Sequence, residues 1–236
     1  DRLVRKITGN PDPYAERKHL SNQKAMETLH LVENLIKKEN SAQSRFRKAC
    51  MCAIVGNVIE FDIPGHNFGY EDIGGLVKNA ESDLAIDETS NFFDLAKKRK
   101  KVVYLADNAG EIAFDKLLVY ELKKLGAHVT VAVKEKPVLN DATMKDAEYV
   151  EMDKVADNIV TTGADAVGLI PKECSKDFLK IYNSADLVVA KGMAYAETLT
   201  EFKLDSPHVL LLRTKCNPVA NYFNVGRDKN IAKIMP

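Results

Sequence analysis

The stretch from Lys101 to Val133 reads KVVYLADNAGEIAFDKLLVYELKKLGAHVTVAV and holds three predicted elements in a row. Two short apolar runs, 102–106 and 129–133, indicate strands that are buried on both faces, as in a parallel sheet. Between them, isoleucine and leucine recur at helical spacing over 111–125, and Gly126 is the kind of residue that ends a helix. A strand, a helix and a strand in this order predict a βαβ unit with a right-handed connection.

Two further apolar runs, at 187–190 and 209–212, extend this pattern toward the C-terminus. Each has the length and composition of a buried strand, so the second half of the chain predicts an open, mainly parallel α/β sheet of the Rossmann-like kind. In such sheets, ligands bind beyond the carboxyl ends of the strands, and the residues that follow each strand become the candidates for function.

The sequence before the basic run KKRKK at 97–101 has a different pattern, with apolar residues at three- and four-residue steps and no strand-like alternation. We expect helices ending near Asn40 and over 41–56, 71–86 and 88–98. The basic run itself is typical of a solvated turn. We therefore predict a helical domain over residues 1–98, followed by a Rossmann-like α/β/α domain over residues 99–236.

Composition excludes several classes of protein. The 236 residues include 34 Lys and Arg against 34 Asp and Glu, and this zero net charge argues against nucleic acid or an anionic membrane as a partner. No apolar run is long enough to span a membrane, and the first ten residues lack the apolar core of a signal peptide, so we expect a cytoplasmic protein. The four cysteines form no zinc-binding spacing.

All four predicted strands end in polar segments. The segments are DNAGE (107–111), KEKPVLND (134–141), KGMAYAE (191–197) and TKCNP (214–218). Carboxylate and amide oxygens are the ligands that hard divalent cations prefer, so Asp107, Asn108 and Asp141 are candidate ligands, with two carboxylates to match the charge of the ion. An alternative explanation for Asp107 and Asn108 is that they cap the following helix.

Motifs of other enzymes with this fold are missing. The sequence contains no G-x-G-x-x-G dinucleotide fingerprint, no Walker A motif and no G-x-S-x-G elbow. The first strand is followed by Asp-Asn and not by the Asp-x-Asp of aspartyl phosphatases. These missing motifs narrow the choice of chemistry at that edge more than composition does.

Taken together, DNAGE (107–111), KPVLNDAT (136–143), KGMAYAETL (191–199) and KCNPVA (215–220) resemble the metal-dependent damage-control phosphatase family, also known as domain of unknown function 89. An upstream segment, GNVIEFD (56–62), is similar to another segment of that family, with Glu60 where the family usually has Asp. The resemblance spans most of the chain and implies a helical domain before an α/β domain.

The resemblance also implies roles for individual residues. Asp107, Asn108 and Asp141 correspond to metal ligands, and Glu111 to a residue that orients a water or a substrate hydroxyl. Lys191 corresponds to a phosphate-binding lysine, and Asn57 to a substrate-binding residue that reaches the site from the helical half. The alternative for Lys191 is a solvated lysine at the end of a strand, and the alternative for Asn57 is a residue that simply ends a helix.

The sequence therefore predicts a phosphatase that uses Mg²⁺, Mn²⁺, Co²⁺ or Ni²⁺ to hydrolyse phosphomonoesters of small metabolites, such as sugar phosphates or damaged phospho-metabolites. Two other hypotheses are an S-adenosylmethionine-dependent carboxyl methyltransferase and a non-catalytic protein that binds phosphorylated metabolites. The single glycine of DNAGE disfavours the methyltransferase. The sequence makes no prediction about the oligomeric state.

Overall fold

A computed structural model describes residues 1–56 and 70–235 of the chain. Its centre is a seven-stranded sheet with the strand order β1-β7-β6-β5-β2-β3-β4. The strands are β1 (Leu84–Asp87), β2 (Lys101–Leu105), β3 (His128–Val133), β4 (Asn158–Thr161), β5 (Leu187–Lys191), β6 (His208–Arg213) and β7 (Asn230–Met235). All neighbours pair in parallel except β6 and β7, which are antiparallel. The predicted α/β class with a mainly parallel sheet is confirmed.

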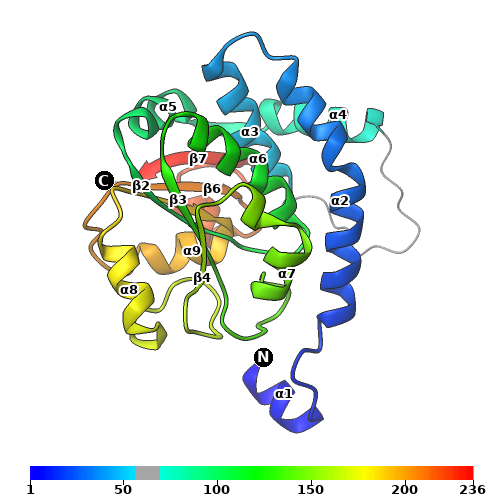
Figure 1. Cartoon of the computed structure of the whole chain (residues 1–236), viewed down its shortest axis with the longest axis vertical. Coiled ribbons are helices and arrows are strands. Elements are labelled where there is room, and N and C mark those ends of the chain that lie inside the picture. Colours follow the sequence, from blue (N-terminus) through cyan, green and yellow to red (C-terminus); the bar gives the residue numbers. More distant parts are fainter. Residues whose placement is uncertain (57–69, 236) are drawn as a thin grey trace.

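Helices cover both faces of the sheet (Figure 1). The helices of the described residues are α1 (Arg2–Thr8), α2 (Ala15–Lys37), α3 (Ala42–Gly56), α4 (Tyr70–Ser82), α5 (Thr89–Lys98), α6 (Glu111–Lys124), α7 (Met144–Tyr149), α8 (Lys176–Asn183), α9 (Gly192–Leu199) and α10 (Asn217–Tyr222), of which α1 lies away from the sheet. Short 3₁₀ turns lie at Met152–Lys154 and Pro171–Glu173. No helix in the described ranges combines the length and the apolar character needed to cross a lipid bilayer.

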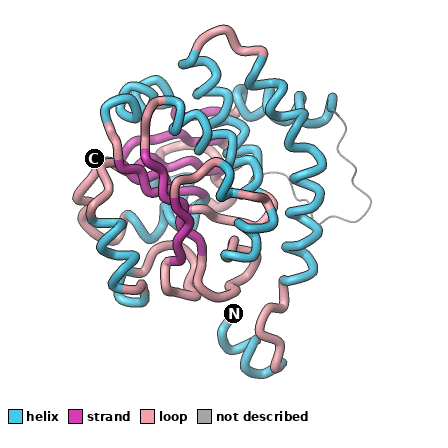
Figure 2. The backbone as a smooth tube through the Cα atoms, viewed as in Figure 1, coloured by secondary structure: helices cyan, strands magenta, loops and turns pink. Residues whose placement is uncertain are grey.

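Along each central strand, successive side chains point alternately into two hydrophobic cores, one on each face of the sheet. In β2, Val102 and Tyr104 pack with α2, α3, α5 and α6, whereas Val103 and Leu105 pack with α8, α9 and α10. Both faces of the strand are covered by helices, which explains why the sequence of β2 is a continuous apolar run and not an alternating one. The tube in Figure 2 shows the strands enclosed between the two helical layers.

One expectation for the first segment is wrong. The helix predicted over 71–86 ends at Ser82, and Leu84–Asp87 forms β1, which pairs with β7. Four residues directly behind a helix are too few to show an alternating pattern, and β7 completes the pairing from the other end of the chain. Since β1 joins the sheet and α3 packs on α6, residues 1–98 do not consist of helices alone, and the division at 98/99 stays a prediction.

Candidate functional site

The loops that follow β2 and β3 are hydrogen-bonded to each other at the carboxyl edge of the sheet. The N–H of Ala142 donates to the carbonyl of Asp107 at 2.7 Å, and the N–H of Ala109 donates to the carbonyl of Asn140 at 2.9 Å. Asn108 and Asp141 form an isolated antiparallel bridge between the loops. The fold therefore brings together the three residues that the sequence proposes as metal ligands.

The carboxylate of Asp107 lies in a space that only glycine leaves open. Gly192, the first residue of α9, has a φ of 78°, and a Cβ atom there would stand 1.8 Å from Oδ2 of Asp107. A left-handed backbone angle and this contact together require glycine at the position. Asp107 is thus held in a buried position between β2 and the start of α9, at 7% exposure.

The amide of Asn108 is oriented by two carboxylates. Its Nδ2 donates to Oδ2 of Asp107 and to Oε2 of Glu111, both at 3.0 Å. With the nitrogen turned toward the acids, the amide oxygen is the atom that Asn108 has available as a ligand for a cation. Glu111 therefore contributes by orienting Asn108.

Asp141 is buried beside a lysine to which the sequence analysis assigned no role. The Nζ atom of Lys134 lies 3.6 Å from Oδ2 of Asp141 and donates to the carbonyl of Gly168 at 2.6 Å. The same ammonium lies 4.6 Å from the ring centroid of Tyr195. Within the described ranges, Oδ2 of Asp141 has no hydrogen-bond donor, although it is buried. The sequence could have indicated that Lys134 is buried, because this residue directly follows the apolar run of β3.

Lys191 is fully buried at the end of β5, and protein atoms accept hydrogen bonds from its ammonium. Nζ donates to Oε1 of Glu111 at 2.5 Å, to Oδ1 of Asp115 at 2.9 Å and to the carbonyl of Ala53 at 2.8 Å. Tyr104 also donates to Oδ1 of Asp115, at 2.6 Å. A phosphate group would have to replace one of the three acceptors of Lys191, and its predicted contact with phosphate stays a prediction.

Asp115 is the second residue that the sequence analysis missed. It is a fully buried acid within the apolar helix α6, on the turn after Glu111. An acid among Ile112, Phe114 and Leu117 was the available signal, because a carboxylate surrounded by apolar residues requires a partner inside the fold.

Negative charge is in excess in this cluster. Asp107, Glu111, Asp115 and Asp141 supply four buried carboxyl groups against the two buried ammonium groups of Lys134 and Lys191. Burial, aided by the charges of Glu111 and Asp141, raises the pKa of Asp107 well above its usual value. Burial also raises the pKa of Asp141 and of Asp115 to about 6. Burial alone would lower the pKa of Lys191, but Asp115 and Glu111 outweigh it and raise that pKa. A divalent cation would match the excess of two negative charges.

A family model, the damage-control phosphatase ARMT1-like domain, matches residues 1–231. The chain belongs to the damage-control phosphatase family.

Individual members of the damage-control phosphatase family are similar along most of their length. A damage-control phosphatase of Archaeoglobus fulgidus is 37% identical over 235 residues, which cover 99% of this chain and 80% of that protein. The damage-control phosphatase PH1575 of Pyrococcus horikoshii is 34% identical over 224 residues, or 94% of this chain and 74% of that protein. The crystal structure of the P. horikoshii protein, described as a DUF89 family protein, aligns with a TM-score of 0.85 at 31% identity and covers 98% of this chain and 78% of that chain. Membership in the family indicates a phosphatase.

The donors at this site of the damage-control phosphatase fold suit a hard divalent cation. Within residues 1–56 and 70–235, no three His, Cys, Asp or Glu side chains converge as a ready metal-binding group. The two carboxylates therefore need the amide oxygen of Asn108, together with water or substrate oxygens, to complete a ligand set. Within the described residues, Oδ2 of Asp141 accepts no hydrogen bond and has the ammonium of Lys134 at 3.6 Å, which leaves it able to serve as a ligand. Asn57, the remaining predicted residue, lies outside the described residues.

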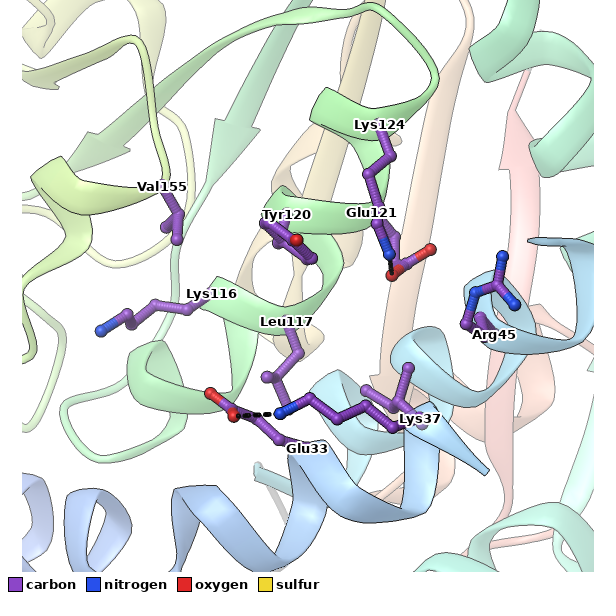
Figure 3. Close-up of a pocket in the computed structure, with 10 residues that line it drawn as sticks. Glu33, Lys37, Arg45, Lys116, Leu117, Tyr120, Glu121, Lys124 and Val155 are labelled. Atoms are coloured by element: carbon purple, nitrogen blue, oxygen red, sulfur yellow. Dashed lines mark hydrogen bonds and ion pairs between the residues drawn. The ribbon is translucent and has the colours of Figure 1, made fainter. Parts of the chain in front are cut away.

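Another cavity lies along the second half of α6, toward the opposite end of that helix from Glu111 (Figure 3). It has a volume of about 320 Å³ and is lined by side chains of α2, α3 and α6 together with Val155. Its charged side chains contact protein partners: Glu33 pairs with Lys37 at 3.2 Å, Glu121 with Lys124 at 2.9 Å, and Lys116 donates to the carbonyl of Val150. None of the described residues that line this cavity is a site residue proposed from the sequence, so the carboxyl edge of the sheet is the better candidate site.

Proposed function

We propose that this protein is a metal-dependent phosphatase that hydrolyses phosphomonoesters of small metabolites, such as sugar phosphates or damaged phospho-metabolites. The observation that carries the proposal is the buried cluster at the ends of β2, β3 and β5 and the start of α6, where four carboxyl groups face two lysines. In the part of the chain that the structure describes, Oδ2 of Asp141 accepts no hydrogen bond. Family membership supports the phosphatase reaction.

In the proposed site, Asp107, Asn108 and Asp141 hold a divalent ion such as Mg²⁺, Mn²⁺, Co²⁺ or Ni²⁺. The chemistry that a bound ion supplies is polarisation of a phosphoryl oxygen and activation of water at neutral pH. Glu111 orients the amide of Asn108 through the 3.0 Å hydrogen bond to its Oε2. Buried surroundings strengthen these interactions, because the charges are poorly screened by water.

Lys191 has two possible contributions to this site. It neutralises Glu111 and Asp115 directly, through contacts of 2.5 and 2.9 Å. If a phosphoryl oxygen replaces one of these acceptors, the same ammonium neutralises charge on the substrate, which is the role that the sequence predicts.

The test is phosphate release by protein stripped with a chelator and then supplied with one metal at a time. Substrates are p-nitrophenyl phosphate and a panel of sugar phosphates, and the variants are Asp107→Ala and, as a control, Asp177→Asn on exposed α8. We expect turnover that requires metal, is lost in Asp107→Ala and is retained in Asp177→Asn, because the side chain of Asp177 is 89% exposed and pairs with Lys180 on its own helix.

Two results would contradict the proposal. Binding of a sugar phosphate without release under any of the four metals would favour the non-catalytic binding protein. Tight calorimetric binding of S-adenosylmethionine, together with absence of phosphatase turnover, would favour the methyltransferase.

A further inference from the structure

Asn22 is a buried amide of α2 that reaches two different segments of the α/β sheet region. It is 2% exposed. Its Oδ1 accepts a hydrogen bond from the backbone N–H of Gly110 at 2.7 Å, and its Nδ2 donates to Oδ1 of Asp146 at 2.8 Å. Both functional groups of one side chain are therefore used, on partners that lie 36 residues apart in the sequence.

The first partner belongs to the loop that carries two of the proposed ligands. Gly110 follows Asp107 and Asn108 and directly precedes α6, with a φ of 78°. Its N–H lies at the start of a helix, where backbone donors have no partner within the helix. The amide oxygen of Asn22 satisfies this donor and fixes the end of the loop.

The second partner holds the loop that carries the third ligand. Oδ2 of Asp146 accepts the backbone N–H of Thr143 at 2.8 Å and its hydroxyl at 2.7 Å. The side chain of Thr143 in turn accepts from the backbone N–H of Asp146, and the two reciprocal backbone bonds form a capping box at the start of α7. Thr143 stands two residues after Asp141. Through Asp146, the side chain of Asn22 is thus connected to the backbone that positions Asp141.

We propose that Asn22 is a positioning residue that sets the separation between Asp107 with Asn108 on one loop and Asp141 on the other, and thereby the affinity of the site for a divalent cation. This inference rests on the proposed metal-dependent function. Partners behind metal ligands typically change metal affinity by 10- to 100-fold when they are removed.

Two features of its surroundings reduce the structural cost of removing Asn22. Lys18, one turn earlier on α2, lies 3.5 Å from Oδ2 of Asp146 and 2.9 Å from Asp12, so Asp146 keeps a cationic partner from the same helix. Asn22 also lines a cavity of about 780 Å³ between α2 and α7, from which water can reach the groups that lose the amide.

The experiment compares Asn22→Ala with Gln23→Ala in full-length protein freed of metal. Gln23 is the neighbouring amide of α2, but it is exposed and donates to Glu27 on its own helix, at 3.0 Å. Electron paramagnetic resonance of free Mn²⁺ gives the dissociation constant without any turnover, and urea unfolding in chelator reports the stability of the metal-free fold. A second variant, Asn22→Asp, keeps an acceptor for Gly110 but loses the donor and faces Asp146.

We expect Asn22→Ala and Asn22→Asp to weaken Mn²⁺ binding by about 10- to 100-fold. The Mn²⁺ concentration for half-maximal phosphatase activity should rise by the same factor, while Gln23→Ala matches the wild type in both measurements. A merely structural role would lower the urea midpoint and leave the Mn²⁺ dissociation constant of the folded fraction unchanged.

The outcomes separate this inference from the proposed function. Wild-type affinity for Mn²⁺ in Asn22→Ala, or in Asn22→Asp if the alanine variant does not fold, overturns the role of Asn22 and leaves the phosphatase proposal intact. A wild-type protein that binds no divalent ion and shows no metal-dependent turnover overturns both.

Discussion

Aspartates occupy both edges of the sheet, but the two edges hold them in opposite ways. At the edge where the strands begin, Asp186 accepts the backbone N–H groups of Lys101 at 2.9 Å and Lys100 at 3.1 Å, and these bonds lower its pKa. Asp157 accepts the N–H of Val129 at 2.8 Å and pairs with Lys123. Burial acts to raise the pKa of Asp157, but these partners outweigh it and lower that pKa.

At the edge where the strands end, burial and neighbouring acids raise the pKa of Asp107 and of Asp141. The same residue type is therefore stabilised as an anion at one edge and disfavoured as an anion at the other. Carboxylates with a lowered pKa are hydrogen-bonded to the backbone where strands begin, whereas crowded carboxylates with a raised pKa are typical of a functional site.

We expect the largest effect on stability from removing a lysine that pairs with the carboxylates of one edge. Lys191→Met leaves Glu111 and Asp115 buried without their counter-charge, and we expect it to lower the free energy of unfolding by about 3–5 kcal/mol. Lys123→Met removes the partly exposed partner of Asp157 and should cost about 0–1 kcal/mol. Urea unfolding at pH 7 measures both. Similar losses in the two variants would show that the edges do not differ in this way.

The next effect concerns catalysis. Asp141→Asn removes a proposed ligand, so we expect metal-dependent phosphatase turnover to fall by at least about 100-fold, since even outer partners of ligands can have this effect. That factor corresponds to about 2.7 kcal/mol. Asp186→Asn, at the opposite edge, should retain turnover within about twofold. Equal activity of the two variants in phosphate-release assays would remove Asp141 from the site.

A smaller effect concerns the pH dependence of stability. The carboxyl group of Asp115 has a pKa of about 6 in the folded protein, against 3.8 as its ordinary value. The folded state therefore keeps this proton between pH 4 and 6 while the unfolded state loses it, so this group contributes less stability as the pH rises. We expect the difference in unfolding free energy between wild type and Asp115→Asn to fall by about 1–3 kcal/mol from pH 4 to 6.

The control for that prediction is Asp186→Asn. The contribution of Asp186 to the unfolding free energy changes with pH in the opposite direction. The folded-state pKa of Asp186 is lowered, so wild type loses this contribution as the pH falls below the ordinary value of 3.8. Unfolding by urea across pH 3 to 7 gives both slopes. Parallel curves for the two variants would contradict the contrast between the edges.

The smallest effect involves His208, which begins β6 at the starting edge. Its Nε2 lies 2.6 Å from the hydroxyl of Tyr182 and its Nδ1 lies 2.7 Å from the carbonyl of Ser206, an arrangement that suits a neutral ring. Burial lowers the pKa of His208, although the bond to Ser206 acts to raise it. Below the ordinary value of 6.5 the unfolded state binds a proton more readily, so stability falls as the pH decreases.

We expect this slope to reach at most about 1.4 kcal/mol per pH unit and to be absent in His208→Gln. Thermal unfolding between pH 7 and 5 measures it. An unchanged slope in His208→Gln would assign the pH dependence to another group.

Much of the fold and part of the site could be predicted from the sequence. The runs at 102–106 and 129–133 and the helix over 111–125 form the predicted βαβ unit as β2, β3 and α6. Asp107, Asn108 and Asp141 were proposed as neighbours because parallel strands end at one edge, and the structure places them on two hydrogen-bonded loops. Their role as metal ligands stays a prediction.

Strand β1 and strand β7 could not be predicted from local pattern. Strand β1 pairs in parallel with β7, which lies far away from it in the sequence. Strand β7 also pairs with β6, in the single antiparallel pairing of the described sheet. A run of only four to six residues carries too little periodicity to be distinguished from a helix end or a loop.

The sequence by itself therefore determined the α/β layering and which polar segments meet at the carboxyl edge, because apolar periodicity and strand direction are local properties. Only the tertiary structure decided that Lys191 is fully buried between Glu111 and Asp115, and that Asn22 of α2 is hydrogen-bonded to both Gly110 and Asp146. Such contacts join residues 76 to 124 positions apart, and their burial depends on how the helical layers close over the sheet.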